Sequence, residues 1–219
     1  MKKPLESESA DGDHEGQLLE SDVFYTLGKP GRFELKIKGS RFIGHATSAG
    51  TQDIAAILVN SISRQYHDAT HHCYAYRIGQ GDGSIFRMND DGEPAGTAGK
   101  PILDVIDRRR LKNVICVVTR YFGGTKLGTG GLARAYGECA AGTLDNGEVI
   151  EKYLTESFLI HFAYEWTGKV MPLMKKYALQ MEKGDFKTQM EIKVIVRRSK
   201  AETFKSDLMN ATSGKVRFT

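Results

Sequence analysis

The chain has 219 residues with a formal net charge of +4, and 40% of its residues are hydrophobic and 26% charged. This composition is typical of a folded soluble protein, and no stretch approaches the roughly 18 apolar residues of a membrane helix, which argues against a membrane partner. The N-terminus has no apolar run of the kind that forms a secretory signal, so we expect a cytoplasmic protein.

Charge is distributed unevenly along the chain. Residues 1–22 contain two lysines against seven aspartates and glutamates, a local charge of −5, so that residues 23–219 carry +9. The first segment also has few apolar residues, which predicts a disordered acidic tail over residues 1–22. A basic folded body favours polyanionic partners such as RNA or the ribosome.

Hydrophobic periodicity predicts a first domain over residues 23–147. A strand at 41–46 precedes a helix that begins after Thr51 and carries one apolar face, formed by Ile54, Ile57, Leu58, Ile62 and Tyr66. Two strands, at 73–78 and 84–87, form a hairpin, and a helix runs from about Pro101 to Lys112. The β-branched run at 114–118 predicts a central strand buried on both faces, followed by a glycine-rich loop and a closely packed helix.

A second domain is predicted over residues 148–219. Strands are expected at 158–163, near 180–182, at 190–196 and at 216–218, with two helices between them. The helices carry apolar side chains on one face, namely Trp166, Val170, Leu173, Met174 and Tyr177 in the first and Phe204 and Leu208 in the second. The order βαββαβ is that of a ferredoxin-like domain, so the fold class is α+β with two domains.

The densest motif is RYFGGTKLGTGGLAR at residues 120–134, with five glycines in nine positions between a predicted strand and helix. Such a loop lets backbone amides approach phosphate at the positive end of a helix. The candidate phosphate- or nucleic-acid-binding residues are Arg120, Gly123, Gly124, Lys126, Gly128, Gly130, Gly131 and Arg134. Alternatively, the glycines serve tight turns and close packing without a ligand. The loop lacks the Lys-Ser/Thr pair of a P-loop and fits a dinucleotide fingerprint only weakly.

Histidines and carboxylates form a second candidate region. His67 and His71 have the spacing of a zinc-protease pair, but no third ligand is evident, which favours polar residues at a helix end. The loop residues Asp90, Asp91 and Glu93 either hold Mg²⁺ or form a solvated turn. We predict a cleft without metal or cofactor, lined by His71, His72, Asp90, Asp91 and Glu93. Whether this cleft meets the glycine-rich loop is left open by the sequence.

No pattern in the sequence identifies a catalytic nucleophile. Cys73, Cys116 and Cys139 are widely spaced within apolar patterns, so we expect reduced thiols that pack as small hydrophobic groups. The pair Tyr121 and Phe122, beside the basic loop, either stacks on bases or plugs the core. A protein that is not an enzyme is therefore the favoured expectation.

Four stretches together resemble the IMPACT/YigZ family: SRFI at residues 40–43, ATHHCYAYR at 69–77, DDGEPAGTAGKPIL at 90–103 and VVTRYFGGTKLG at 117–128. The resemblance extends over about residues 25–145, and the βαββαβ segment resembles the extra C-terminal domain of the bacterial YigZ branch. It implies a first domain like the second domain of a small-subunit ribosomal protein, and a second like the last domain of elongation factor G. Both folds occur on RNA or on the ribosome.

The resemblance also bears on partners. Eukaryotic relatives are linked to restraint of a starvation-responsive initiation kinase through competition for its activator protein, and they carry an N-terminal partner-binding domain that we do not find here. A translation-factor protein is therefore a second candidate partner after RNA.

Three functions remain in competition. The leading hypothesis is a non-enzymatic RNA- or ribosome-binding regulator of translation that uses the basic glycine-rich loop and has no DNA specificity. The alternatives are a Mg²⁺-dependent enzyme or binder of a phosphorylated small molecule or RNA end, and a protein-interaction module.

Overall fold

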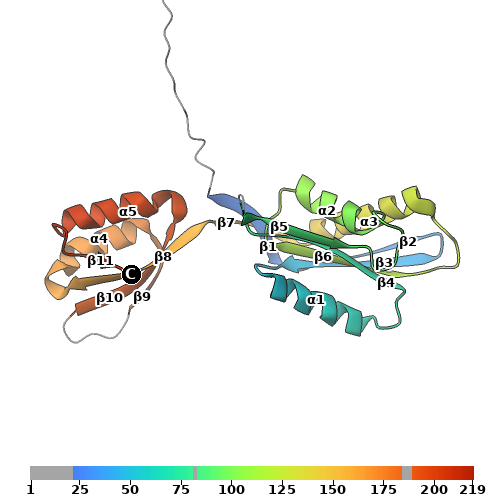
Figure 1. The fold of residues 1–219 in the computed structure, drawn as a ribbon, viewed down its shortest axis with the longest axis horizontal. Helices are drawn as coiled ribbons and strands as arrows, with labels where there is room; N and C mark the ends of the chain where they lie inside the picture. Colours follow the sequence, from blue (N-terminus) through green and yellow to red (C-terminus); the bar gives the residue numbers. More distant parts are fainter. Residues whose placement is uncertain (1–21, 81–82, 184–188) are drawn as a thin grey trace, which may run out of the picture. The chain divides into compact units, whose positions relative to one another are not determined.

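A computed structural model describes residues 22–80, 83–183 and 189–219. The acidic tail predicted for residues 1–22 lies, apart from Asp22, outside the described residues. The chain divides into two compact units, one spanning Val23–Leu154 and the other Thr155–Thr219 together with Asp22 (Figure 1). None of the helices in the described part of the chain is long and apolar enough to cross a membrane.

The first unit is built on a five-stranded sheet in which every neighbouring pair is antiparallel. Its strands, in spatial order, are β2 (Gly31–Ile37), β3 (Ser40–Ser48), β6 (Val114–Tyr121), β4 (His71–Ile78) and β5 (Ile85–Asn89). The predicted central strand is therefore confirmed as β6, with two strands on each side.

Helices cover both faces of this sheet. On one face α2 (Gly99–Arg108) and α3 (Gly128–Asp145) lie side by side, and α1 (Gln52–Gln65) lies on the other (Figure 1). Side chains of β6 alternate between the two layers, because Cys116 and Val118 pack toward α2 and α3 whereas Ile115 and Val117 pack toward α1. This explains why the strand reads as an uninterrupted apolar run.

Helix α1 begins as predicted but buries only part of the predicted face, namely Ile62 with the partly buried Leu58 and Tyr66. The Thr51 side chain accepts a hydrogen bond from the Ile54 amide and so caps the helix. Ile54 and Ile57, however, are 46% and 67% exposed, so their predicted place in the core is wrong. The helix packs on the sheet through Ala55 and Ile62, which are seven residues apart and therefore lie on one face.

Two strands that the sequence analysis does not predict form a separate ribbon. β1 (Val23–Lys29) pairs antiparallel with β7 (Glu148–Tyr153), and Leu27 of β1 is buried in the core with α2 and α3. The boundary predicted after Gly147 is therefore misplaced, because β7 pairs within the first unit and that unit continues to Leu154.

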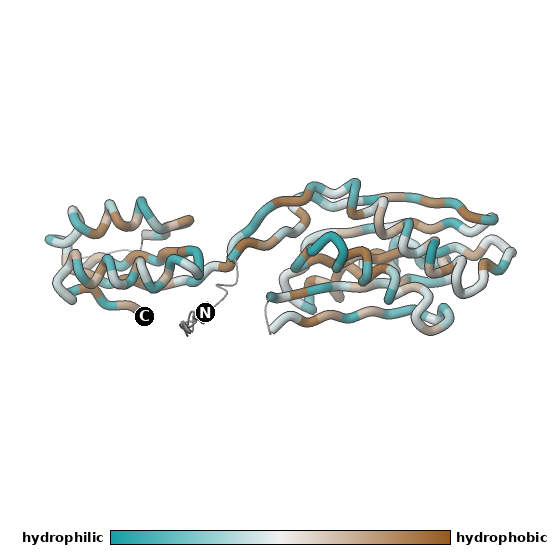
Figure 2. The backbone as a smooth tube through the Cα atoms, turned by 90° about the horizontal axis from the view of Figure 1, so that it is seen from above, coloured by the Kyte–Doolittle hydropathy of each residue, from teal (hydrophilic) through white to brown (hydrophobic). Residues whose placement is uncertain are grey.

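The second unit contains the six elements predicted for it, in the predicted order. They are β8 (Thr155–Ala163), α4 (Thr167–Tyr177), β9 (Ala178–Lys183), β10 (Gln189–Arg197), α5 (Arg198–Ala211) and β11 (Arg217–Phe218), with a short 3₁₀ turn at Tyr164–Trp166. The strands form an antiparallel sheet in the order β11-β8-β10-β9. Hydrophilic and hydrophobic residues alternate along both helices (Figure 2), whose apolar sides form one core with the sheet.

Candidate functional site

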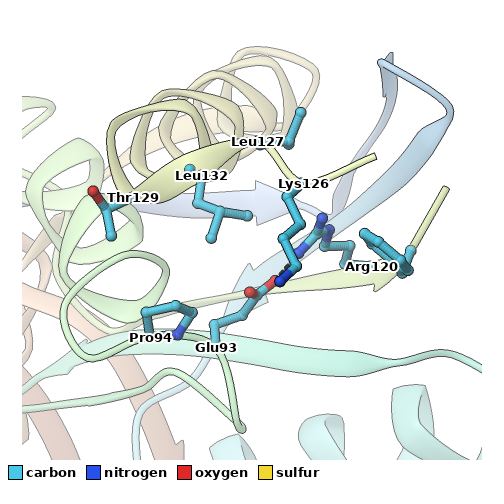
Figure 3. A pocket seen from close by; sticks show the side chains of 9 residues that line it. Glu93, Pro94, Arg120, Lys126, Leu127, Thr129 and Leu132 are labelled. Carbon is cyan, nitrogen blue, oxygen red and sulfur yellow. Dashed lines mark hydrogen bonds and ion pairs between the residues drawn. The ribbon is translucent and has the colours of Figure 1, made fainter. Parts of the chain in front are cut away.

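The glycine-rich loop between β6 and α3 lies against a cavity of about 320 Å³, which we call the glycine-loop pocket. Its lining residues are Glu93, Pro94, Arg120, Phe122, Lys126, Leu127, Gly128, Thr129 and Leu132. Figure 3 shows the side chains of Glu93, Arg120 and Lys126 pointing toward one another. The acidic loop and the glycine-rich loop therefore meet, a point that the sequence leaves open.

The N-terminus of α3 opens onto this pocket. The helix begins at Gly128, and Leu127 at the N-cap position makes no side-chain capping bond. The first amide groups of a helix have no partner within it and carry the positive end of the helix dipole. Gly128 and Thr129 line the pocket, so this end of α3 presents N–H donors to an anion.

The glycines of the loop have different structural reasons. A Cβ atom at Gly123 would lie 1.9 Å from the carbonyl carbon of Gly39, so close backbone packing requires glycine there. Gly124 and Gly128 have φ values of +84° and +72°, which other residues rarely adopt. Gly130 has neither constraint, because a Cβ there would meet no described atom within 4 Å. At Gly131 a Cβ would lie 3.2 Å from Leu127 Cβ, a tight contact. Packing and turns therefore account for Gly123, Gly124 and Gly128, and Gly130 alone of the five has neither a close contact nor a positive φ.

Arg120 is buried in the wall of the pocket rather than extended into solvent. Its side chain is 5% exposed and its Nη1 donates to Glu93 Oε1 over 2.6 Å, while Nη2 donates to Ser40 Oγ. The guanidinium lies 5.4 Å from the ring centres of both Phe42 and Phe122. Its Nε is buried without a partner among the described residues. The guanidinium is therefore held in the pocket wall by its bonds to Glu93 and Ser40, and it is not the freely available phosphate contact that the sequence analysis expects.

Glu93 is the centre of a buried polar network. The Tyr136 hydroxyl donates to Glu93 Oε1 over 2.7 Å, and His71 Nε2 lies 3.9 Å from the same oxygen. Burial raises the pKa of Tyr136, which keeps the phenol protonated as a donor. Cys73 Sγ in turn contacts the Tyr136 hydroxyl at 3.3 Å. The network fixes the acidic loop to β4, β6 and α3.

The three carboxylates of the acidic loop serve different partners. Asp90 accepts the amides of Gly96, Ala98 and Gly99 at the start of α2, whereas Asp91 accepts the His72 amide over 2.6 Å. Across the described residues, no group of three or more His, Cys, Asp or Glu side chains is arranged to hold a metal ion. The geometry therefore gives no specific support to the Mg²⁺ alternative.

Replacing Asp90 by asparagine is expected to make stability less sensitive to acid. Burial raises the pKa of the Asp90 carboxyl, but its three backbone hydrogen bonds together outweigh burial and hold the pKa below the usual value. A carboxyl with a lowered folded-state pKa contributes stability above its unfolded pKa of about 3.9, and this contribution disappears as pH falls through the folded pKa. Urea denaturation between about pH 2 and 6 should show a steeper acid loss in the wild type. Equal pH dependence of the two proteins would contradict this assignment.

Two of the cations predicted to act together are separated. Lys126 is exposed, lines the glycine-loop pocket and makes no ion pair with a described residue. Arg134 lines a different surface depression with Pro101 and Asp104. Thr129 and Leu132 face the pocket, and Arg134 is two residues beyond Leu132, about 200° further around the helix. Thr129 also lines the pocket but was not predicted as a site residue. Its position between two glycines is the sequence signal that could have identified it.

The three cysteines are free and buried, as predicted. Burial raises the pKa of each thiol, that of Cys139 to about 12, so none is a thiolate at neutral pH. Phe122, in contrast to these core residues, is 48% exposed, which rules out the core-plug interpretation of this ring.

Comparison with known proteins agrees with the motifs. Residues 38–144 match the Impact N-terminal domain. The chain is 38% identical over 192 residues to the IMPACT family member YvyE of Bacillus subtilis, covering 88% of each chain. It is 31% identical over 180 residues to the IMPACT family member YigZ of Escherichia coli, covering 82% of this chain and 88% of YigZ. A crystal structure described as that of a hypothetical protein superimposes with a TM-score of 0.68 at 28% identity, covering 90% of this chain and 96% of that one. The resemblance inferred from the sequence is confirmed, and the chain belongs to the IMPACT family.

Proposed function

We propose that this IMPACT family protein is a non-enzymatic, cytoplasmic regulator of translation that binds RNA, free or within the ribosome, through the glycine-loop pocket. The observation that carries the proposal is the meeting of two kinds of donor at one cavity. They are the uncapped N-terminus of α3 and the exposed Lys126 ammonium. Both favour an anion, and a phosphate oxygen can accept from both.

The exposed ring of Phe122 points to a nucleic acid rather than to inorganic phosphate. Its ring lies over the Arg120 guanidinium, yet 48% of the residue remains exposed. Stacking of a base on such a ring is worth about 1–3 kcal/mol and tolerates any base, which is how single-strand binders combine affinity with low sequence specificity. A phosphate site next to a stacking ring is the arrangement that a single strand requires.

Charge and family resemblance support the same ligand. Residues 23–219 carry +9, which attracts polyanions and accelerates their association. We further propose that the first domain resembles the second domain of a small-subunit ribosomal protein, and that the second resembles the last, ferredoxin-like domain of elongation factor G. Both resemblances favour RNA by analogy of fold alone, which is weaker support than the pocket itself.

Binding of a fluorescently labelled single-stranded RNA of about 16 nucleotides, followed by anisotropy across a salt series, tests the proposal. Lys126→Ala should weaken binding and reduce the slope of log K against log salt by about 0.7, because one phosphate contact is lost. Arg134→Ala is the matched control, since it removes the same charge from the same region but outside the pocket. Its slope should stay at the wild-type value.

Phe122→Ala should weaken binding by about 1–3 kcal/mol with little change in the salt slope, because it removes stacking and not charge. Phe86→Ala provides the control, since Phe86 is 57% exposed and lies 5.2 Å from the Arg77 guanidinium on a different strand. If wild-type protein fails to bind RNA at low salt, or if each variant equals its control, the proposed function is wrong.

A further inference from the structure

A second concentration of positive charge lies in the C-terminal unit. A cavity of about 440 Å³, which we call the basic pocket, is formed where the end of α4 meets the start of β9, the end of β10 and the first turns of α5. Lys176, Arg197 and Lys200 line it together with the polar side chains of Tyr177 and Thr203. Among the described residues, no carboxylate lines the pocket.

One carboxylate that contacts a lysine of the pocket is only loosely engaged. Asp207 accepts a hydrogen bond from Tyr177 over 2.7 Å and lies 3.3 Å from Lys176 Nζ. The Lys176 and Asp207 side chains are 61% and 35% exposed, and ion pairs of that exposure contribute little to stability. The Lys176 ammonium can therefore turn to a phosphate at small cost.

The start of α5 beside this pocket already holds one oxyanion. The Asp22 carboxylate accepts the Ser199 amide over 3.3 Å and the Ser199 hydroxyl over 2.5 Å. Arg197, at the N-cap position, makes no side-chain capping bond. The first turn of this helix thus binds a negatively charged group in the folded protein, as expected from the helix dipole.

The charge balance of the unit makes the basic pocket part of a wider basic body. Residues 155–219 contain twelve lysines and arginines against seven aspartates and glutamates, a net charge of +5 over 65 residues. Residues 23–154 contain seventeen against thirteen, a net charge of +4 over 132 residues. The positive charge density is therefore highest in the C-terminal unit, although the glycine-rich loop lies in the other.

We infer that the basic pocket is a second phosphate-binding surface, which contacts the backbone of a bound RNA through Lys176, Lys200 and Arg197. The inference takes the ligand class from the proposed function but assigns a different site. A polynucleotide fits because it offers phosphates at regular spacing to three cations, and because Leu179, 46% exposed at the same pocket, offers apolar surface to a sugar or base.

The test uses the full chain and the same RNA salt series. Lys176→Ala/Lys200→Ala should reduce the slope of log K against log salt by about 1.4, because each phosphate contact to a single strand contributes about 0.7. Lys193→Ala/Lys215→Ala is the matched control, since it removes two lysines of the same unit that do not line the basic pocket. Thermal unfolding of both double variants checks that each is folded, and the control should keep the wild-type slope.

The outcomes separate this inference from the proposed function. Equal slopes for the two double variants, with Lys126→Ala still impaired, would overturn the basic pocket alone and leave the glycine-loop pocket intact. Polyglutamate that competes as well as unlabelled RNA of equal charge would overturn RNA as the occupant. Wild-type protein that binds no RNA would overturn both proposals.

Discussion

Glu93→Ala is expected to lower the free energy of unfolding by about 3–5 kcal/mol, the cost of removing one partner of a buried ion pair. The Glu93 and Arg120 side chains are 4% and 5% exposed, so the remaining guanidinium would be left uncompensated away from water. The Tyr136 hydroxyl would lose its carboxylate acceptor as well. Urea denaturation at neutral pH measures the loss, with the midpoint and the slope compared against the wild type.

A double replacement separates the ion pair from simple packing. Arg120→Met/Glu93→Leu fills a similar volume without charge, and such swaps are often close to neutral. We therefore expect the double variant to be clearly more stable than Glu93→Ala. If Glu93→Ala lowered the free energy of unfolding by less than about 1 kcal/mol, the ion pair would instead be open to water, because exposed pairs contribute at most that much.

Gly123→Ala is expected to destabilise by about 3 kcal/mol, the upper end of the usual cost of overpacking. The added Cβ would lie 1.9 Å from the Gly39 carbonyl carbon and 2.2 Å from the Ser40 nitrogen. Both are backbone atoms, so relief requires the turn between β2 and β3 to move away from the end of β6. The change is measured by chemical denaturation and by the shift in the thermal midpoint.

Gly130→Ala, in the same loop-to-helix segment, is the matched control and is expected to act in the opposite direction. A Cβ at this position would have no described atom within 4 Å, and Gly130 is inside α3, where alanine is favoured over glycine by about 1 kcal/mol. If both substitutions destabilised equally, the distinction between packing glycines and open-backbone glycines would fail.

The pattern of adjacent residues is enough to predict helices and strands that have a strong signal within their own sequence. The β-branched run of β6 and the Thr51 cap of α1 are read directly from adjacent residues and are confirmed. β1 and β7 are different, because each is paired with the other across almost the whole first unit and neither has a strong local signature. β2 does alternate, with Phe33, Leu35 and Ile37 facing the core cluster, and this period of two was a usable signal.

Contacts between residues distant in sequence are even harder to predict for the candidate site. Sequence density of glycine and charge identifies the loop, but it cannot show that Arg120 is paired with Glu93, because the two belong to elements brought together only by the sheet. Nor can it separate Lys126 from Arg134, since that distinction depends on which side of α3 each residue occupies. Tertiary contacts determine which of the predicted side chains are already paired within the protein and which can still contact a ligand.

The most direct test of the central claim is to follow the backbone amide resonances of isotopically labelled protein during titration with single-stranded RNA. We expect the amides of Gly128, Thr129 and Gly130 to shift first among those of the first unit, because they form the uncapped end of α3. Shifts confined to other parts of that unit, or none at an RNA concentration that saturates binding, would contradict the assignment of RNA phosphate to the glycine-loop pocket.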